Sequence, residues 1–384
     1  MPEPKQATTM ESNSKQIIFH HPRAIEREGN SGSRVRPRQL VDAFCNLGFE
    51  VFEVTGESHH RAERLRLLQS RLKDGETFAF CYAENAPSPY ALTDPDHFPR
   101  RPTLDHTFFK IVKSLKIPTG LFYRDIYWRF PTFKEEHPWW RRILCYPFYH
   151  YDLISIMRSS LDCLFLPSQR MATHFPRYFR CPPIHALPPG CVQQPLSDSK
   201  PFRGVGFYVG GILPPIYNLD PLFRVMAQLP EWKLNLVCRE DEYQAAKDIY
   251  PWSERTNISV VHASGSRVAE MLREADLFLW LYEPDPYREF AMPVKIFEAM
   301  GASLPIITNQ NDASGNFIAR ENIGWAAESV DGCVEIIRRL SNSPHLLAEK
   351  RQMVLKAQER HTWRRRAETV AQILSGTNQP NTCR

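Results

Sequence analysis

The sequence of 384 residues lacks several features that would narrow its function. Its nine cysteines include no Cys-x-x-Cys pair and no spacing with histidine that is typical of a metal site, so they predict reduced thiols in a reducing compartment. No run of about 18 apolar residues is present, which argues against a membrane-spanning helix. The N-terminus has no apolar segment of the kind that a signal peptide needs. These absences favour a cytoplasmic protein.

An excess of one charge sign is also absent. The formal net charge is +5, and the 48 Lys and Arg residues are scattered among 43 Asp and Glu residues, so the sequence gives no indication of nucleic-acid binding. Glycine is less frequent than proline, at 17 against 32, and the prolines fall mostly at segment ends, as in loops. The length suits two domains of roughly 150 to 200 residues each.

Strand and helix signals alternate through the chain. Gln16–His20 predicts a first strand, and residues 39–54 predict a helix followed by a second strand. This order is a βαβ unit, which predicts a parallel sheet. After a proline-rich segment at 188–203, a second series begins with the strand and glycine turn of Gly206–Gly211. Residues 346–374 predict one continuous basic helix near the C-terminus.

These patterns divide the chain into five parts. In chain order they are a disordered tail (1–14), a first Rossmann-like domain (15–190), a linker (191–203), a second Rossmann-like domain (204–360) and a basic C-terminal helix that crosses back to the first domain, with its tail (361–384). In open α/β sheets, ligands bind beyond the carboxyl ends of the strands. Two facing sheets would therefore place one ligand from each domain in the cleft between them.

The segment at 292–309, MPVKIFEAMGASLPIITN, carries the most specific chemistry. Pro293 suits a helix start, because it lacks an amide that would be unpaired there, and Gly301 suits the helix end. The N-terminus of such a helix offers free amides and a partial positive charge to a phosphate. Glu298 lies about one turn inside the helix, where a carboxylate can accept the hydroxyls of a ribose, and Lys295 precedes it by three residues.

This segment resembles the nucleotide-sugar site of retaining GT-B glycosyltransferases of the family-4-like group, which typically carries MPxKxxEYMAxGxPV here. The resemblance covers roughly residues 16–375 and implies an α/β GT-B fold, in which two Rossmann-like domains face each other across a cleft. It implies that the first domain binds the acceptor and the second a nucleotide-diphosphate sugar as donor substrate, without a metal or other cofactor. The residues that it assigns to the donor are Met292, Pro293, Val294, Lys295 and Glu298.

One departure from the family pattern concerns the first of two glutamates. The family usually places them eight positions apart, whereas Phe290 stands eight positions before Glu298 and Glu289 stands nine before it. Either the loop absorbs one residue or the role of the first acid is altered. We expect Glu289 to face the donor sugar.

A second departure lies after the first strand of the second domain. Gly210 and Gly211 follow that strand and would let the backbone approach a diphosphate closely. The family often places an Arg and a Lys just beyond this turn, where this chain has ILPPIYN. Arg239, at the end of another strand, is the substitute that we expect, although a surface arginine fits equally. His262 and Glu283 follow further strands at the same edge of the sheet.

Polar residues of the first domain mark an acceptor site under this resemblance. Arg124 and Asp125 end a strand within an aromatic frame, where they either line a pocket or form a structural ion pair. Asp125 is the acid that we expect to contact the acceptor. The expected catalytic residues are Glu289, Asp125 and Arg124. The expected acceptor residues are Gly32, Ser33, Arg34, Arg36 and Glu84.

Residues 137–146, HPWWRRILCY, combine paired tryptophans with paired arginines. Such a helix could lie on the cytoplasmic face of a membrane, with tryptophan at the interface and arginine on anionic headgroups. A helix packed between domains or in a core fits the pattern as well. The expected membrane contacts are Trp139, Trp140, Arg141 and Arg142.

Three functions are compatible with these residues. The first is transfer of a hexose from a nucleotide-diphosphate sugar to a glycan or lipid-linked glycan, with retention, in cell-surface polysaccharide biosynthesis. The second is a catalytically silent GT-B-like subunit that binds a nucleotide or a partner. The third is a sugar-nucleotide epimerase, which would convert the donor without any acceptor.

Overall fold

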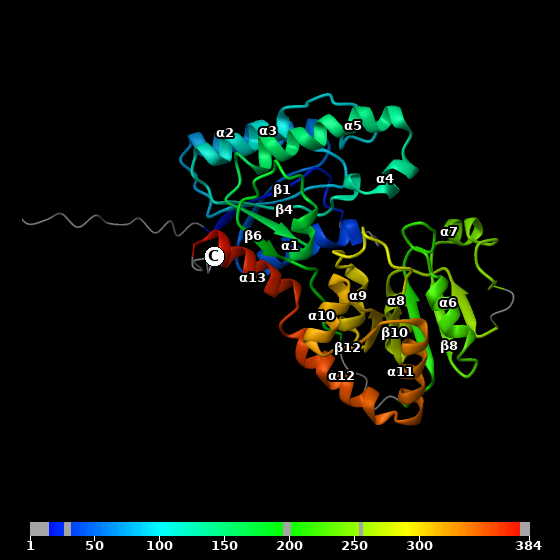
Figure 1. Cartoon of the computed structure of the whole chain (residues 1–384). Helices are drawn as coiled ribbons and strands as arrows, with labels where there is room; N and C mark the ends of the chain where they lie inside the picture. The colour runs from blue at the N-terminus through cyan, green and yellow to red at the C-terminus, as the bar shows by residue number, and fades with distance from the viewer. Residues whose placement is uncertain (1–14, 27–31, 195–200, 253–255, 377–384) are drawn as a thin grey trace, which may run out of the picture.

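Two parallel sheets with helices around them make up the chain (Figure 1). The computed structural model describes residues 15–26, 32–194, 201–252 and 256–376. The tail predicted at 1–14 lies outside the described residues. The first sheet has the strand order β2 (Glu50–Thr55), β1 (Gln16–His21), β3 (Cys81–Glu84), β4 (Thr119–Phe122), β5 (Cys163–Leu166) and β6 (Ile184–Ala186). The second has the order β12 (Gly324–Ala327), β11 (Ile306–Asn309), β10 (Leu277–Trp280), β7 (Val205–Val209), β8 (Lys233–Val237) and β9 (Ile258–Val261).

Helices cover both faces of the first sheet, because its strands bury apolar side chains on both sides. Ile17 and Phe19 belong to the core cluster that includes α1 (Gly32–Asn46). Ile18, between them, belongs to the cluster on the opposite face. The helices on that face include α2 (Ser58–Lys73), α3 (Leu104–Ser114), α4 (Pro131–Glu136) and α5 (Trp139–Asp152).

The basic C-terminal stretch forms two helices rather than the one continuous helix predicted from the sequence. They are α12 (His345–Gln358) and α13 (Trp363–Leu374). The chain breaks between them because the side chain of Thr362 caps α13, accepting a hydrogen bond from the backbone N–H of Arg365 at 3.2 Å. The break lets α13 pack on α1, where Trp363 is buried in the core of the first domain (Figure 1).

The second sheet carries one continuous apolar core. Its other helices are α6 (Asp220–Ala227), α7 (Glu240–Ala245), α8 (Ser266–Glu274), α9 (Val294–Gly301), α10 (Ala313–Glu321) and α11 (Val330–Asn342). Gly301 ends α9 where the chain from the first domain passes close by, since a Cβ atom there would lie 2.3 Å from the carbonyl oxygen of Val192. Among the described helices, none has the length and apolar character needed to cross a bilayer.

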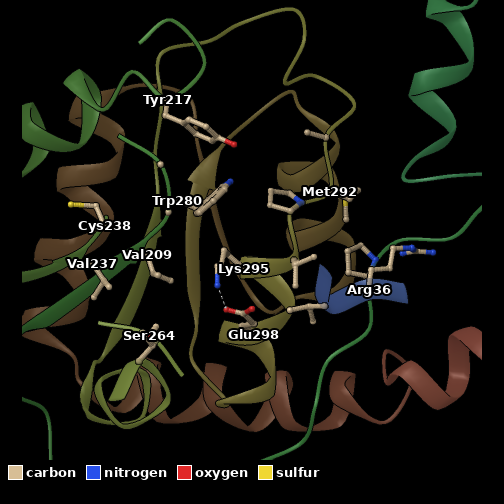
Figure 2. A pocket seen from close by; sticks show the side chains of 18 of the residues that line it. Arg36, Val209, Tyr217, Val237, Cys238, Ser264, Trp280, Met292, Lys295 and Glu298 are labelled. Carbon is tan, nitrogen blue, oxygen red and sulfur yellow. Dashed lines mark hydrogen bonds and ion pairs between the residues drawn. The ribbon is translucent and has the colours of Figure 1, made fainter. Parts of the chain in front are cut away.

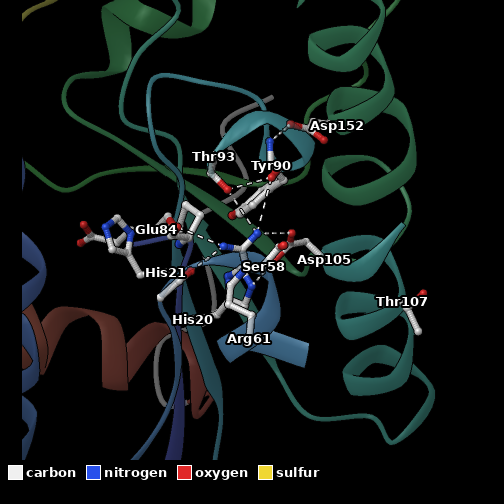
Figure 3. Close-up of polar contacts among 12 residues, drawn as sticks. His20, His21, Ser58, Arg61, Glu84, Tyr90, Thr93, Asp105, Thr107 and Asp152 are labelled. Atoms are coloured by element: carbon white, nitrogen blue, oxygen red, sulfur yellow. Dashed lines mark hydrogen bonds and ion pairs between the residues drawn. The ribbon is translucent and has the colours of Figure 1, made fainter. Parts of the chain in front are cut away.

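A buried polar network joins β1 to α2 and α3 (Figure 3). The guanidinium of Arg61 donates two hydrogen bonds to the carboxylate of Asp105, both at 2.9 Å. His20 Nε2 lies 2.8 Å from the same carboxylate, and its burial lowers the pKa of the imidazole. Burial alone would raise the pKa of Asp105, but Arg61 and His20 outweigh that effect and lower the pKa to about 2. The carboxylate is therefore ionised in the folded chain.

The C-terminal end of α5 is anchored by a second buried carboxyl group. Asp152 accepts a hydrogen bond from the backbone N–H of Tyr90 at 2.9 Å, and the hydroxyl of Tyr149 donates to the carbonyl of Pro87 at 2.8 Å. Burial raises the pKa of Asp152 to about 8, because it penalises the charged form. This carboxyl group is therefore mostly neutral at pH 7.

Asp152→Asn is expected to flatten the dependence of stability on pH. The folded pKa of about 8 lies above the unfolded value, so the free energy of unfolding falls as the pH rises from about 4 to about 8. One such group contributes at most about 1.4 kcal/mol per pH unit. Asparagine can still accept from Tyr90 but does not ionise. Denaturant unfolding at pH 5 and pH 8 measures both slopes, and equal slopes would contradict the assignment.

Candidate active site

A cavity of about 1130 Å³ lies between the two domains. The second domain lines it with the segments that follow β7, β8 and β9 and with the start of α9 (Figure 2). The first domain lines it with α1 and with residues that follow β3, β4 and β5. The cavity thus lies at the carboxyl ends of both sets of strands, where the sequence placed the ligands.

Helix α9 brings the residues of the MPVK segment into this cavity. Pro293 is the N-cap residue with an extended backbone, and the first two residues of the helix, Val294 and Lys295, line the cavity. The Nζ atom of Lys295 donates to a carboxylate oxygen of Glu298 at 2.7 Å, and both side chains are partly exposed (Figure 2). A carboxylate has about four acceptor positions, so Glu298 can bind hydroxyls while Lys295 remains bound.

The glycine turn after β7 also lines the cavity. A Cβ atom at Gly211 would lie 2.6 Å from the ring of Tyr217, and one at Gly210 would lie 2.9 Å from the hydroxyl of Tyr208. Glycine at these positions therefore lets the aromatic side chains fold over the turn. It also leaves the backbone of the turn exposed to the cavity.

Two further predicted residues lie at the ends of β8 and β9. The ring of His262 faces the backbone of the neighbouring strand, with Nδ1 3.1 Å from the carbonyl oxygen of Cys238. Arg239 is largely exposed and pairs with Glu242 at 3.3 Å, so its charge is already balanced. Ser264 continues this wall of the cavity (Figure 2).

The first domain contributes Arg36, Arg124 and Asp125 to the opposite wall. Arg36 is held by a hydrogen bond to Glu84 at 3.0 Å, and its guanidinium carbon lies 3.5 Å from the centre of the Phe122 ring. Burial lowers the pKa of Arg124 and raises that of Asp125.

Asp125 also forms one of the contacts between the two domains. Its carboxylate accepts a hydrogen bond from the hydroxyl of Tyr287 in the second domain at 2.6 Å. The backbone N–H of Tyr127 donates to the other carboxylate oxygen at 2.7 Å. Both Arg124 and Asp125 line the cavity, which agrees with the first of the two alternatives that the sequence left open for them.

Three predicted glutamates do not line the cavity. Glu84 is buried beneath Arg36, where it also accepts from the hydroxyl of Tyr82, so we assign it to supporting Arg36 instead of contacting an acceptor. Glu283 is exposed outside the cavity. Of the predicted acceptor residues, Gly32, Ser33 and Arg34 begin α1, but their side chains are not part of the described structure.

Glu289 is the third predicted glutamate that does not line the cavity, and its position differs most from the sequence-based expectation. Its side chain is exposed, whereas its neighbours Arg288 and Phe290 both line the cavity. Phe290 packs across the domain boundary on Phe130 and His174, with ring centres 5.7 and 5.2 Å apart. We therefore no longer place Glu289 at the donor sugar.

The cavity-lining residues that sequence reasoning missed include Tyr217, Trp280, Tyr287 and Arg288. The aromatic residues gave no signal, because each fits a buried strand end or loop equally well. Arg288 stands directly beside Glu289 in a segment already marked as important. The positive charge of Arg288 was the signal from which this residue could have been assigned to the site.

Solved glycosyltransferase structures share this arrangement of the whole chain. One, described as WaaG, a glycosyltransferase involved in lipopolysaccharide biosynthesis, matches with a TM-score of 0.59 and 16% identity over 94% of this chain and 100% of that chain. Another, Anabaena Alr3699/HepE in complex with UDP-glucose, matches with a TM-score of 0.57 and 13% identity over 94% and 99%. Residues 220–372 match the model of a family described as "Glycosyl transferase-like". The chain therefore has the GT-B fold, and a segment that is mostly in its second domain resembles glycosyl transferases.

This likeness confirms the GT-B fold that residues 292–309 suggested. A search of curated proteins gave no match. A solved structure of a GtfA/B complex is also similar, with a TM-score of 0.54 and 15% identity over 82% of this GT-B chain and 60% of that chain.

Proposed function

We propose that this GT-B protein transfers a hexose from a UDP-sugar to a glycan or lipid-linked glycan, with retention, in cell-surface polysaccharide biosynthesis. The observation that carries the proposal is the cavity that places Lys295, Glu298 and the start of α9 opposite Arg124 and Asp125. The likeness to HepE in complex with UDP-glucose supports uridine as the base, and the likeness to WaaG supports a lipid-linked acceptor. The resemblance of residues 292–309 supports retention.

The residues of the cavity divide this chemistry between the domains. Glu298 binds the ribose hydroxyls and so directs the diphosphate of the donor at the start of α9. Negative charge develops on that diphosphate as the sugar leaves, and the amides of α9 together with Lys295 stabilise it. Cations of the chain thus replace a metal in this proposal. Asp125 lies on the acceptor side, where its raised pKa suits it to accept the proton of an acceptor hydroxyl.

Acceptor-dependent release of UDP tests this function. The wild-type protein is mixed with UDP-glucose or UDP-galactose, with and without a lipid-linked glycan extract, and in the presence or absence of EDTA. We expect UDP release that needs the extract and persists in EDTA, and a product whose anomeric configuration matches that of the donor. Conversion of the donor without the extract would instead indicate an epimerase.

A catalytically silent subunit is the second candidate. It is favoured by the absence of an acid at Phe290 and of a cation in the ILPPIYN loop, both of which the family pattern carries. The likeness to the GtfA/B complex is consistent with a protein that acts beside a partner. Binding of UDP without any turnover in the assay above would favour this candidate.

We further propose that α5 contacts an anionic membrane surface on the cytoplasmic side. Trp139, Trp140, Ile143 and Leu144 have exposed fractions of 66, 53, 61 and 59%, and their spacing places them on one side of the helix. Arg141 and Arg142, half-buried, supply positive charge beside this apolar surface. Helix α5 lies in the outer layer of the first domain (Figure 1).

The eight described cysteines are free thiols, which is compatible with a reducing compartment.

Trp139→Ser/Trp140→Ser is expected to weaken membrane binding. Sedimentation with vesicles of phosphatidylcholine, alone or mixed with phosphatidylglycerol, measures it. The wild type should bind the mixed vesicles, and the variant should bind them at least about tenfold more weakly, because two large apolar side chains are lost. Phe98→Ser, which removes another exposed aromatic residue of the same domain, is the control. Equal binding by wild type and the double variant would contradict the proposal.

A further inference from the structure

The loop that follows the glycine turn of β7 has no cation of its own. It runs from Ile212 to Asn218 and is held by the hydroxyl of Tyr250, which donates to the carbonyl of Ile212 at 2.8 Å. Tyr217 and Ile216 of this loop line the cavity beside Gly211. A diphosphate bound at this turn would therefore meet an apolar and aromatic wall unless another segment supplied positive charge.

Arg288 enters the same corner from the segment that precedes α9. Its guanidinium donates to the carbonyl of Ile216 at 3.1 Å, which ties it to the loop without cations. The guanidinium carbon lies 3.5 Å from the centre of the Tyr282 ring, with the rings of Tyr217 and Trp280 at 5.5 and 5.8 Å. These aromatic contacts restrict the side chain to one region of the cavity wall.

Among the cations that the second domain directs into the cavity, Arg288 is the one without a carboxylate partner in the described structure. Those cations are Arg239, Arg288 and Lys295. Arg239 pairs with Glu242, and Lys295 pairs with Glu298. Within the described residues, no carboxylate oxygen lies within 4.0 Å of the Arg288 guanidinium, which donates to the Ile216 carbonyl and also contacts the Tyr282 hydroxyl.

We propose that Arg288 binds the diphosphate of the donor and replaces the Arg and Lys that the family pattern carries after the glycine turn. This inference rests on the proposed use of a UDP-sugar. A guanidinium has five N–H donors, so the contacts with Ile216 and Tyr282 leave others for two phosphate oxygens. Arg288 and the start of α9 then contact the diphosphate from two sides. Arg288 would thus supply, from the segment before α9, the positive charge that the family pattern supplies from the loop after the glycine turn.

Binding of UDP and uridine to wild type, Arg288→Met, Arg288→Lys and Arg224→Met tests the inference. Uridine reports the base and ribose contacts, and UDP adds the diphosphate. Arg288→Met should bind UDP about 10- to 100-fold more weakly and uridine as the wild type does, because only charged hydrogen bonds to phosphate are lost. Arg288→Lys should restore part of the loss. Arg224→Met, the control, removes an exposed arginine of the same domain that does not line the cavity, and it should leave both affinities unchanged.

The outcomes separate this inference from the proposed function. Wild-type binding of UDP that survives in Arg288→Met would overturn the inference alone. An equal loss of UDP and uridine would also overturn it, since that result indicates a structural role. Failure of the wild type to bind UDP would overturn the proposed function, and the inference with it. Thermal unfolding without ligand verifies that each variant is folded.

Discussion

Glu298→Ala is expected to bind UDP at least about 100-fold more weakly than the wild type and to lose transfer activity to a similar extent. Hydrogen bonds to a charged group contribute about 1.5–3 kcal/mol each, and the carboxylate can accept two from the ribose. Calorimetry with UDP and with 2′-deoxy-UDP measures the effect. The wild type should prefer UDP, whereas Glu298→Ala should bind both nucleotides with nearly equal affinity.

Two other glutamates serve as controls for this result. Glu283→Ala and Glu289→Ala each remove an exposed carboxylate that does not line the cavity. Both variants should bind UDP within about threefold of the wild type, since surface charges outside the site contribute little. A large loss in Glu289→Ala would show that the sequence-based assignment of this acid was right and that the structure-based revision is wrong.

The buried network of the first domain gives the second large effect. Arg61→Met leaves the carboxylate of Asp105 ionised with only His20 beside it, and both partners in the wild type are nearly inaccessible, with exposed fractions of 1 and 2%. Removing one partner of a buried ion pair costs about 3–5 kcal/mol. For a domain of this size the melting temperature should fall by roughly 6–20 °C. Thermal unfolding monitored by circular dichroism measures the change.

The double variant Arg61→Met/Asp105→Leu tests whether the loss of stability comes from the unpaired charge of Asp105. It removes both charges and replaces them with apolar side chains, so it should be more stable than Arg61→Met alone. Arg100→Met is the exposed control, because Arg100 forms a bidentate pair with Asp96 at the surface. It should leave the melting temperature unchanged. A double variant that is less stable than Arg61→Met would contradict the account of the network.

Much of the fold could be predicted because its signals are local. Apolar strands that end in glycine or polar residues repeat through the chain, and the strand and helix order fixes parallel sheets. The ends of individual helices and strands were predicted less accurately. Helix α1 begins at Gly32, before Pro37, although the sequence suggested a start near residue 39. A proline near a helix start removes few hydrogen bonds, so it marks the boundary poorly.

The common position of Pro293, Lys295 and Glu298 on the cavity wall could also be predicted, because all three lie at the start of one helix or within it and their spacing fixes their positions. The remaining parts depend on contacts between distant segments. The direction of the Arg288 side chain depends on the loop around Ile216, which lies 72 positions earlier. Arg61 and Asp105 are 44 positions apart, on helices where charged residues usually face solvent. Nothing in the sequence pairs them.

The measurement that tests the central claim most directly is thermal unfolding of the wild type against UDP, dTDP, GDP, ADP and CMP. A ligand at about 100 times its dissociation constant adds roughly 2.7 kcal/mol to the stability of the folded state. We predict that UDP raises the melting temperature by several degrees, more than the other nucleotides do. If none of the five shifts the transition, the cavity is not a nucleotide-sugar site, and the account of this protein as a UDP-sugar-dependent transferase is wrong.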